Sequence, residues 1–136
     1  MAILSQIIYK GDLRTEAEHL ASGVKIISDA PVDNHGKGEA FSPTDLVSTA
    51  LAQCMITLMG IAANNHEISL GKIVAEVTKT RASEPRRISV IKVDVKIENL
   101  NYSNKDKTIL EKAALTCPVA KSLSPDVIQD ITFIYS

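Results

Sequence analysis

The stretch SPTDLVSTALAQCMITLMGIAA, residues 42–63, decides the fold because it predicts one long apolar helix in a chain of 136 residues. Ser42 is a residue type that suits a helix N-cap, and Pro43 suits the first helical position. Asp45 follows at the third helical position, which gives a start similar to a capping box. We therefore expect a helix that begins at Pro43 and runs to about Ala63.

This helix is apolar over most of its girth. Residues 46–65 carry no charge, a length that raises the question of a membrane span. No basic residues anchor the ends of this segment, and six polar residues interrupt it: Ser48, Thr49, Gln53, Thr57, Asn64 and Asn65. The pattern favours a central helix that is buried on several sides. In a domain this small, we expect a partner subunit to cover part of its surface.

The residues before the helix read as a meander of three short strands. Ile3, Ile7 and Tyr9 alternate on one face, and Lys10-Gly11-Asp12 predicts a tight turn. Residues 13–20 and 24–28 predict the second and third strands. Residues 30–40 are rich in Pro, Asn and Gly, which predicts an ordered loop.

The residues after the helix predict two strands, two helices and a last strand. In residues 88–98, apolar residues alternate with charged ones, so one face is core and the other faces water. The other elements are expected at 73–81, 104–115, 118–123 and 130–135, with Ser103 or Asn104 as the cap of the second helix and Pro118 as its stop. The order βββ-α-ββ-α-α-β, without repeats, predicts an α+β fold.

Composition limits the classes of function. The length predicts a single domain, residues 1–136. A net charge of -1 and 4% aromatic residues give no signature of a protein that binds nucleic acid or an anionic membrane. The first twelve residues lack a basic segment followed by a long apolar one, so we expect no secretory signal and a cytoplasmic location.

The two cysteines, Cys54 and Cys117, are 63 positions apart, which excludes a CxxC redox loop. Cys54 lies on the apolar helix, where the simplest interpretation is a small core residue whose pKa is raised by burial. Cys117 precedes Pro118 at a helix start, where free N–H groups and the helix dipole favour a negative sulfur. Local physics therefore predicts Cys117 as the better thiolate, although Cys117 can equally be a filler between two helices.

The charged candidates have simple structural interpretations. Arg14 shares a strand face with Glu16 and Glu18, which favours a solvated ion pair of less than about 1 kcal/mol. The alternative is that Arg14 directs a permanent cation at a sulfur. Asp45 is most simply a helix cap. The three histidines are scattered without metal-ligand spacing, so no metal site is predicted.

Two separated cysteine motifs resemble a known family. The segment FSPTDL (41–46), leading into Ala52-Gln53-Cys54-Met55, and the segment CPVAKSL (117–123) are similar to those of the OsmC/Ohr family, the osmotically inducible and organic hydroperoxide resistance proteins. Gly11-Asp12-Leu13-Arg14 fits as well. The resemblance covers nearly the whole chain, in order.

The resemblance implies an OsmC-like α+β fold with antiparallel sheets around a long buried central helix, in an intertwined homodimer with active sites at the interface. It implies a peroxidase of the oxidative stress response that reduces organic hydroperoxides without a cofactor. Cys54 corresponds to the cysteine that attacks the peroxide, and Cys117 to the resolving cysteine. Arg14 corresponds to the arginine that holds the thiolate. An external dithiol would complete the cycle.

One position departs from the family pattern. The acid that pairs with the arginine usually follows the helix-opening proline, where this chain has Thr44. Asp45 comes one position later, which turns its side chain by about 100° around the helix. Three alternatives stay open: Asp45 or Glu39 takes the place of the missing acid, or Arg14 is held loosely, which would weaken the activity or change its substrate.

Two other functions fit the same residues. A non-catalytic module could bind an apolar ligand at the dimer interface, which the missing acid at Thr44 favours. A metal or thiol-sensor site could use both cysteines, although the placement of the histidines gives it little support.

Overall fold

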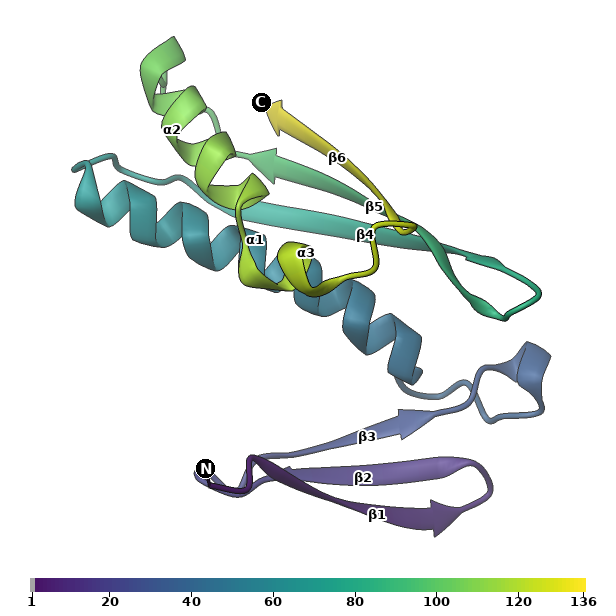
Figure 1. Ribbon diagram of the computed structural model, residues 1–136. Helices are drawn as coiled ribbons and strands as arrows, with labels where there is room; N and C mark the ends of the chain where they lie inside the picture. The colour runs from purple at the N-terminus through teal and green to yellow at the C-terminus, as the bar shows by residue number, and fades with distance from the viewer. Residues whose placement is uncertain (1) are drawn as a thin grey trace. The chain divides into compact units, whose positions relative to one another are not determined.

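The computed structural model describes residues 2–136, which form two compact units, Met1–Val47 and Ser48–Ser136. Each unit is described by itself. Within the described residues the elements follow the predicted order, with one short 3-10 helix added (Figure 1). The elements are β1 (Ser5–Gly11), β2 (Arg14–His19), β3 (Lys25–Asp29), η1 (Val32–Asn34), α1 (Pro43–Asn65), β4 (Ile73–Ala82), β5 (Arg87–Ile97), α2 (Asn104–Leu115), α3 (Pro118–Ser122) and β6 (Ile128–Tyr135). The α+β prediction is confirmed; the prediction of a single domain stays a prediction.

The first unit contains the predicted meander. β1, β2 and β3 form an antiparallel sheet in that order, with Tyr9 opposite Thr15 and Arg14 opposite Asp29. The β1–β2 turn contains Asp12 and Leu13 with positive φ angles of 53° and 63°. These conformations reverse the chain sharply, so that Arg14 opens β2 opposite the end of β3.

The loop after β3 folds back on the sheet end. The Gly38 N–H donates to the Ala30 carbonyl at 3.2 Å, and the Asp29 N–H donates to the Phe41 carbonyl at 3.0 Å. A Cβ atom on Gly36 would lie 1.8 Å from the Ala30 oxygen, so only glycine fits this approach. The loop thereby brings the backbone of Glu39 beside β3.

α1 begins with the predicted capping box. The Asp45 N–H donates to Ser42 Oγ at 3.1 Å, and the Ser42 N–H donates to Asp45 Oδ2 at 2.9 Å. These reciprocal bonds satisfy two backbone donors of the first turn. Pro43 takes the first helical position, as predicted, and the helix ends two residues later than expected, at Asn65.

The prediction that a partner subunit covers part of α1 stays a prediction, and the single chain buries one face of this helix. Its buried residues share one face: Ser48, Leu51, Ala52, Met55, Met59 and Ala63. On other faces Val47 and Ile61 stay exposed, Ile61 by 49%. By length and composition alone α1 could cross a membrane, but core helices of soluble proteins pass the same test. A helix sequence that is apolar on most sides does not predict which of its faces are buried within the same chain.

The second unit is built on a three-stranded sheet with β5 in the middle. The alternation predicted for β5 is confirmed, because its inward side chains are fully buried: Ile91, Val93, Val95 and Ile97. The same core contains Met55 and Met59 from α1 and Leu110 from α2. Both helices therefore cover one face of this sheet.

One detail of the sheet differs from expectation. β4 and β5 are antiparallel, but β5 and β6 run parallel, with Val93 opposite Ile131. The expectation of antiparallel sheets is wrong for this pair. α2 and α3 form the connection between the two strands, which is the kind of crossover that parallel strands require.

Ser103 provides a simple test of the helix caps. Its side chain accepts a hydrogen bond from the Asp106 N–H at 3.0 Å, which resolves the choice between Ser103 and Asn104. We expect Ser103→Ala to lower the free energy of unfolding by about 1 kcal/mol, and Ser103→Asp to retain the wild-type value. Urea unfolding of the three proteins measures this. An equal loss of unfolding free energy in both variants would show that the Ser103 cap bond does not account for the effect.

Candidate functional site

The two cysteines meet in the second unit. Cys54 lies in the middle of α1 and is partly exposed, whereas Cys117 is the N-cap of α3 and is fully buried. Both are free thiols, and they lie close enough together for Cys54 to raise the pKa of Cys117. The 63 positions between them are therefore bridged by the fold. We call Cys54 and Cys117 the thiol pair.

The surroundings of Cys117 correct the expectation that it is the better thiolate. Burial raises the pKa of the Cys117 thiol, and the adjacent Cys54 raises the pKa further. The Ala120 N–H donates to Cys117 Sγ at 3.2 Å, and this bond and one from the Val119 N–H act in the opposite direction. The helix-start donors exist as predicted, but the loss of solvent outweighs them.

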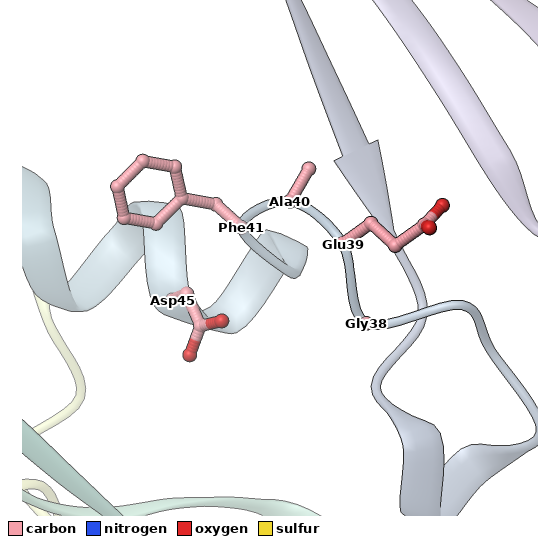
Figure 2. A pocket seen from close by; sticks show the side chains of 5 residues that line it. All are labelled: Gly38, Glu39, Ala40, Phe41 and Asp45. Atoms are coloured by element: carbon pink, nitrogen blue, oxygen red, sulfur yellow. The ribbon is translucent and has the colours of Figure 1, made fainter.

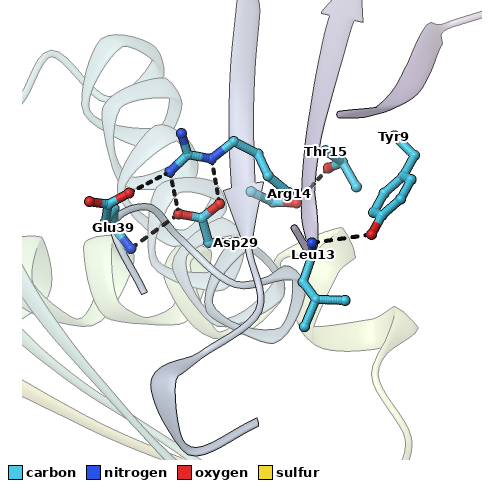
Figure 3. Close-up of polar contacts among 7 residues, drawn as sticks. Tyr9, Leu13, Arg14, Thr15, Asp29 and Glu39 are labelled. Carbon is cyan, nitrogen blue, oxygen red and sulfur yellow. Dashed lines mark hydrogen bonds and ion pairs between the residues drawn. The ribbon is translucent and has the colours of Figure 1, made fainter. Parts of the chain in front are cut away.

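A second cluster of functional groups lies in the first unit (Figure 3). Arg14 Nε and Nη2 donate to the two carboxylate oxygens of Asp29 at 2.6 and 2.7 Å. Nη2 also donates to Glu39 Oε1 at 3.0 Å. Within the described residues the Nη1 group has no recorded partner. We call Arg14, Asp29 and Glu39 the arginine cluster.

The three members of the arginine cluster differ in exposure and charge. The Asp29 side chain is fully buried, that of Arg14 is mostly buried, and that of Glu39 is exposed. The hydrogen bonds from Arg14 lower the pKa of Asp29 against the opposing effect of burial. The Glu39 N–H, which donates to Asp29 Oδ2 at 3.1 Å, lowers this pKa further. Asp29 in turn raises the pKa of Arg14. The guanidinium is thus charged and fixed in orientation.

The cluster overturns the simple interpretation of Arg14. It does not pair with Glu16 and Glu18 across its strand face; Lys25 lies near both of those carboxylates, at 4.0 and 3.9 Å. Arg14 is the first residue of β2, beside the last residue of β3 and the loop that follows it, and these supply Asp29 and Glu39 as its acidic partners. Of the two acids considered in the sequence, Glu39 is the one that contacts Arg14.

Asp45 has a different position. It lines a surface hollow of about 340 Å³ together with Gly38, Glu39, Ala40 and Phe41 (Figure 2). Its carboxylate caps α1 through the Ser42 N–H, and Figure 2 shows the Asp45 and Glu39 side chains pointing in different directions. Thr44, at the position of the missing acid, has its hydroxyl 3.2 Å from Ser42 Oγ.

His19 and His66 contact groups that are three or four positions away in the chain. His19 Nδ1 lies 2.6 Å from Ser22 Oγ, and His66 Nδ1 lies 3.0 Å from the Ala62 carbonyl oxygen. Residues 2–136 contain no group of three or more His, Cys, Asp or Glu side chains that could hold a metal ion.

The thiol pair and its sequence surroundings fall within a known family. The family model described as OsmC-like protein matches residues 36–131, which include α1, both cysteines and the first half of β6. The chain belongs to the OsmC-like protein family.

Solved structures agree with this membership. A Psychrobacter arcticus protein, provisionally described as an osmotic stress induced and detoxification response protein, is 50% identical over 98% of this chain and 96% of that one, with a TM-score of 0.92. The organic hydroperoxide resistance protein OsmC of Legionella pneumophila is 20% identical over 98% of each chain, with a TM-score of 0.73. An OsmC-like protein of Mycoplasma pneumoniae is 17% identical over 96% and 94%, with a TM-score of 0.80. At these lower identities the likeness concerns the fold. No curated protein sequence matches the chain.

In this OsmC-like chain, Asp29 is a member of the arginine cluster that the sequence did not predict. The residue ends β3, and the sequence places it in no charged cluster. The observed β2–β3 hairpin is centred between Ala21 and Ser22, which sets Arg14 opposite Asp29. A hairpin centred on the predicted Ser22-Gly23 turn would instead set Arg14 opposite Pro31, so the predicted strands did not identify Asp29.

The Asp29 carboxylate gives this OsmC-like protein a specific dependence on pH. Because the pKa of Asp29 is lower in the folded than in the unfolded state, its stabilising effect is complete above the unfolded pKa of about 3.9. The effect is lost as the pH falls through the lowered folded pKa. We expect Asp29→Asn to be clearly less stable than wild type at pH 7, and the difference to shrink below about pH 4.

Urea unfolding midpoints at pH 7, 5, 4 and 3 measure this difference. Glu39→Gln is the matched control: it removes the other carboxylate from Arg14, but at an exposed position where an ion pair contributes little. A deficit of Asp29→Asn that stays constant from pH 7 to pH 3 would contradict the assignment.

Proposed function

We propose that the chain is a thiol-dependent peroxidase that reduces organic hydroperoxides. The observation that carries the proposal is the thiol pair, because two cysteines far apart in sequence lie in one unit, close enough for Cys54 to raise the pKa of Cys117. Family membership supports it, as does the name of the Legionella relative, an organic hydroperoxide resistance protein. Two unrelated core cysteines would not be expected to lie close together.

In the proposed cycle, the Cys54 thiolate attacks the outer oxygen of the hydroperoxide. The O–O bond breaks, the alcohol takes a proton and leaves, and Cys54 becomes a sulfenic acid. The Cys117 thiol then condenses with it, so that a disulfide forms and one water is released. An external dithiol reduces the disulfide by two exchange steps and becomes a disulfide itself.

The arginine cluster has a proposed supporting role. A fixed guanidinium is suited to hold a thiolate, and the Nη1 group is the part of Arg14 that Asp29 and Glu39 leave available. In this proposal Asp29 and Glu39 together replace the acid missing at Thr44. Asp45 acts by starting α1, the helix that carries Cys54.

We also propose that the functional form is a homodimer. The β1–β2–β3 sheet exposes apolar side chains on both faces, since Ile7 and Ile8 alternate along β1 and are 59% and 55% exposed. Ile26 and Ile27 do the same on β3. Exposed apolar area of this kind marks an interaction surface. Light scattering on the purified protein tests this: a mass of one chain at micromolar concentration would contradict the dimer.

The decisive experiment for the peroxidase is consumption of cumene hydroperoxide with dithiothreitol as the reductant. We expect turnover by wild type and none above the background rate by Cys54→Ser. Hydrogen peroxide, which gains nothing from an apolar site, is expected to be a poorer substrate. Equal rates for the two proteins would refute the peroxidase. A co-purified apolar ligand without turnover would then favour the non-catalytic binding module.

The cytoplasmic location stays a prediction. It agrees with the two free thiols of a protein that needs a dithiol reductant, because cytoplasmic conditions keep thiols reduced. Fractionation of cells that express the full-length protein measures it.

A further inference from the structure

The two sulfurs of the thiol pair differ in how a reductant can reach them. Cys117 Sγ belongs to a residue with 0% exposure, enclosed by the core cluster and by its own backbone turn into α3. Cys54 is partly exposed on α1. Thiol–disulfide exchange requires the attacking thiolate to approach one sulfur directly, so the rate depends on which sulfur is accessible. Access alone therefore favours attack at Cys54.

The two sulfurs also differ in their hydrogen-bond donors. The Ala120 N–H donates to Cys117 Sγ at 3.2 Å, and the Val119 N–H is directed at the same sulfur. None of the described backbone N–H groups donates to Cys54 Sγ. When a disulfide opens, the leaving sulfur carries the negative charge, and the N–H bonds offset part of the cost of burying that charge on Cys117.

The donors beside Cys117 are held in place by the second unit itself. Gln129 Nε2, on β6, donates to the Ala120 carbonyl at 3.1 Å, and Ser122 Oγ donates to the Pro118 carbonyl at 2.8 Å. The Gln129 bond fixes α3 against β6, and the Ser122 bond lies within α3. The N–H groups therefore need no rearrangement when charge develops on Cys117.

From these contacts we propose that the external dithiol attacks Cys54 Sγ and that Cys117 leaves as the thiolate. In this step the reductant thiolate forms a new S–S bond to Cys54, and the Cys54–Cys117 bond breaks with its electron pair on Cys117. The second thiol of the reductant then attacks the reductant's first sulfur, the one bonded to Cys54 in the mixed disulfide, and the reductant becomes a cyclic disulfide. Cys54 is released as a thiolate, ready for the next peroxide, and Cys117 takes up a proton.

This inference deepens the proposed peroxidase, and it rests on the disulfide that the proposal contains. It predicts the chemical form of the enzyme–reductant intermediate, with the adduct on Cys54 and a free thiol at Cys117. It also implies that the reductant binds where α1 exposes Cys54, and that α3 stays folded during reduction. A reductant that had to reach Cys117 would first have to open the core.

The experiment maps the adduct formed by a monothiol, which stops after the first exchange. Wild-type protein is oxidised with diamide, so that the test does not depend on peroxide turnover. It is then mixed briefly with excess glutathione and quenched with acid. The free cysteine is alkylated, and peptide mass spectrometry locates glutathione and the alkyl group.

We expect glutathione on Cys54 in at least roughly tenfold excess over Cys117 in the folded protein. The matched control is the same oxidised protein in urea, where both sulfurs are accessible and the excess should fall to within about threefold. Glutathione mainly on Cys117, or the same ratio in both conditions, would overturn the inference. Failure of diamide to join the two cysteines would overturn it as well.

The outcomes separate this inference from the peroxidase itself. If cumene hydroperoxide is not consumed but the folded disulfide still opens at Cys54, the peroxidase fails and the inference holds. If the peroxide is consumed and glutathione is found on Cys117, the inference fails and the peroxidase holds.

Discussion

Without any reductant, one equivalent of cumene hydroperoxide is expected to remove both thiols from wild type, one thiol from Cys117→Ser and none from Cys54→Ser. In wild type, the sulfenic acid on Cys54 condenses with Cys117, so two thiols disappear for each peroxide. In Cys117→Ser there is no resolving thiol, and the reaction stops at the sulfenic acid. This is the largest effect that we predict, because the outcome of a single substitution is complete loss of the reaction.

The prediction for Cys54→Ser depends on the state of Cys117. Its side chain is fully buried and burial raises the pKa of its thiol, so the thiolate fraction and the access of peroxide are both low. The remaining thiol of Cys54→Ser should therefore survive. Helix-start donors alone would have predicted the reverse order of reactivity.

Thiol titration in denaturant, after a timed exposure to peroxide, measures the three outcomes. Trapping with dimedone is the control, since it reacts with a sulfenic acid and should label Cys117→Ser but not the other two proteins. Loss of the Cys117 thiol in Cys54→Ser, at the rate seen in wild type, would refute the assignment of Cys54 as the attacking residue.

Leu110→Ala is expected to lower the free energy of unfolding by about 2–5 kcal/mol, a large part of the stability of a small domain. Leu110 lies on α2 with 0% exposure and packs in the core cluster with the inward face of β5. Removing its side-chain atoms leaves a cavity that the closely packed neighbours fill only in part.

Leu115→Ala is the matched control for this prediction. It is the same change five residues further along α2, at a position that is 53% exposed, and we expect a loss within about 0.5 kcal/mol. Urea unfolding of the two variants and wild type gives the comparison. Similar losses at both positions would mean that α2 does not pack as described.

The sequence predicted elements best where several local signals agreed. The limits of α2 were predicted without error, because Ser103 marks its start and Pro118 follows its end. The capping box of Ser42 and Asp45 fixed the start of α1, and the alternation in β5 identified its buried face. Each of these features is determined by residues that are neighbours in the chain.

What the sequence could not predict depends on partners that are distant in the chain. The alternation in β5 identifies its inward face but not the direction of β6 beside it, so the parallel pairing was missed. Arg14 was assigned to the wrong acids because its true partner, Asp29, is defined by the register of two strands. The pKa of Cys117 depends on burial, which local helix-start signals do not report.

The candidate site was predicted in part. The family resemblance named Cys54, Cys117 and Arg14, and the thiol pair is found in one unit. Glu39 was one of the two acids expected near Arg14 and is found there, whereas Asp29 was missed. The link between Arg14 and Cys54 stays a prediction.

The parallel pairing of β5 and β6 has a consequence for the order of folding. β1–β2 and β4–β5 join residues a few positions apart, such as Tyr9 with Thr15 and Ala82 with Arg87. β6 must instead find β5 across the whole α2–α3 connection, as in the pairing of Val90 with Ile128. Long-range contacts of this kind have a larger entropic cost of loop closure, so they form more slowly than local contacts. We expect the hairpins to form first and β6 to add last, so that φ-values should be higher for truncations in β4 than for truncations in β6.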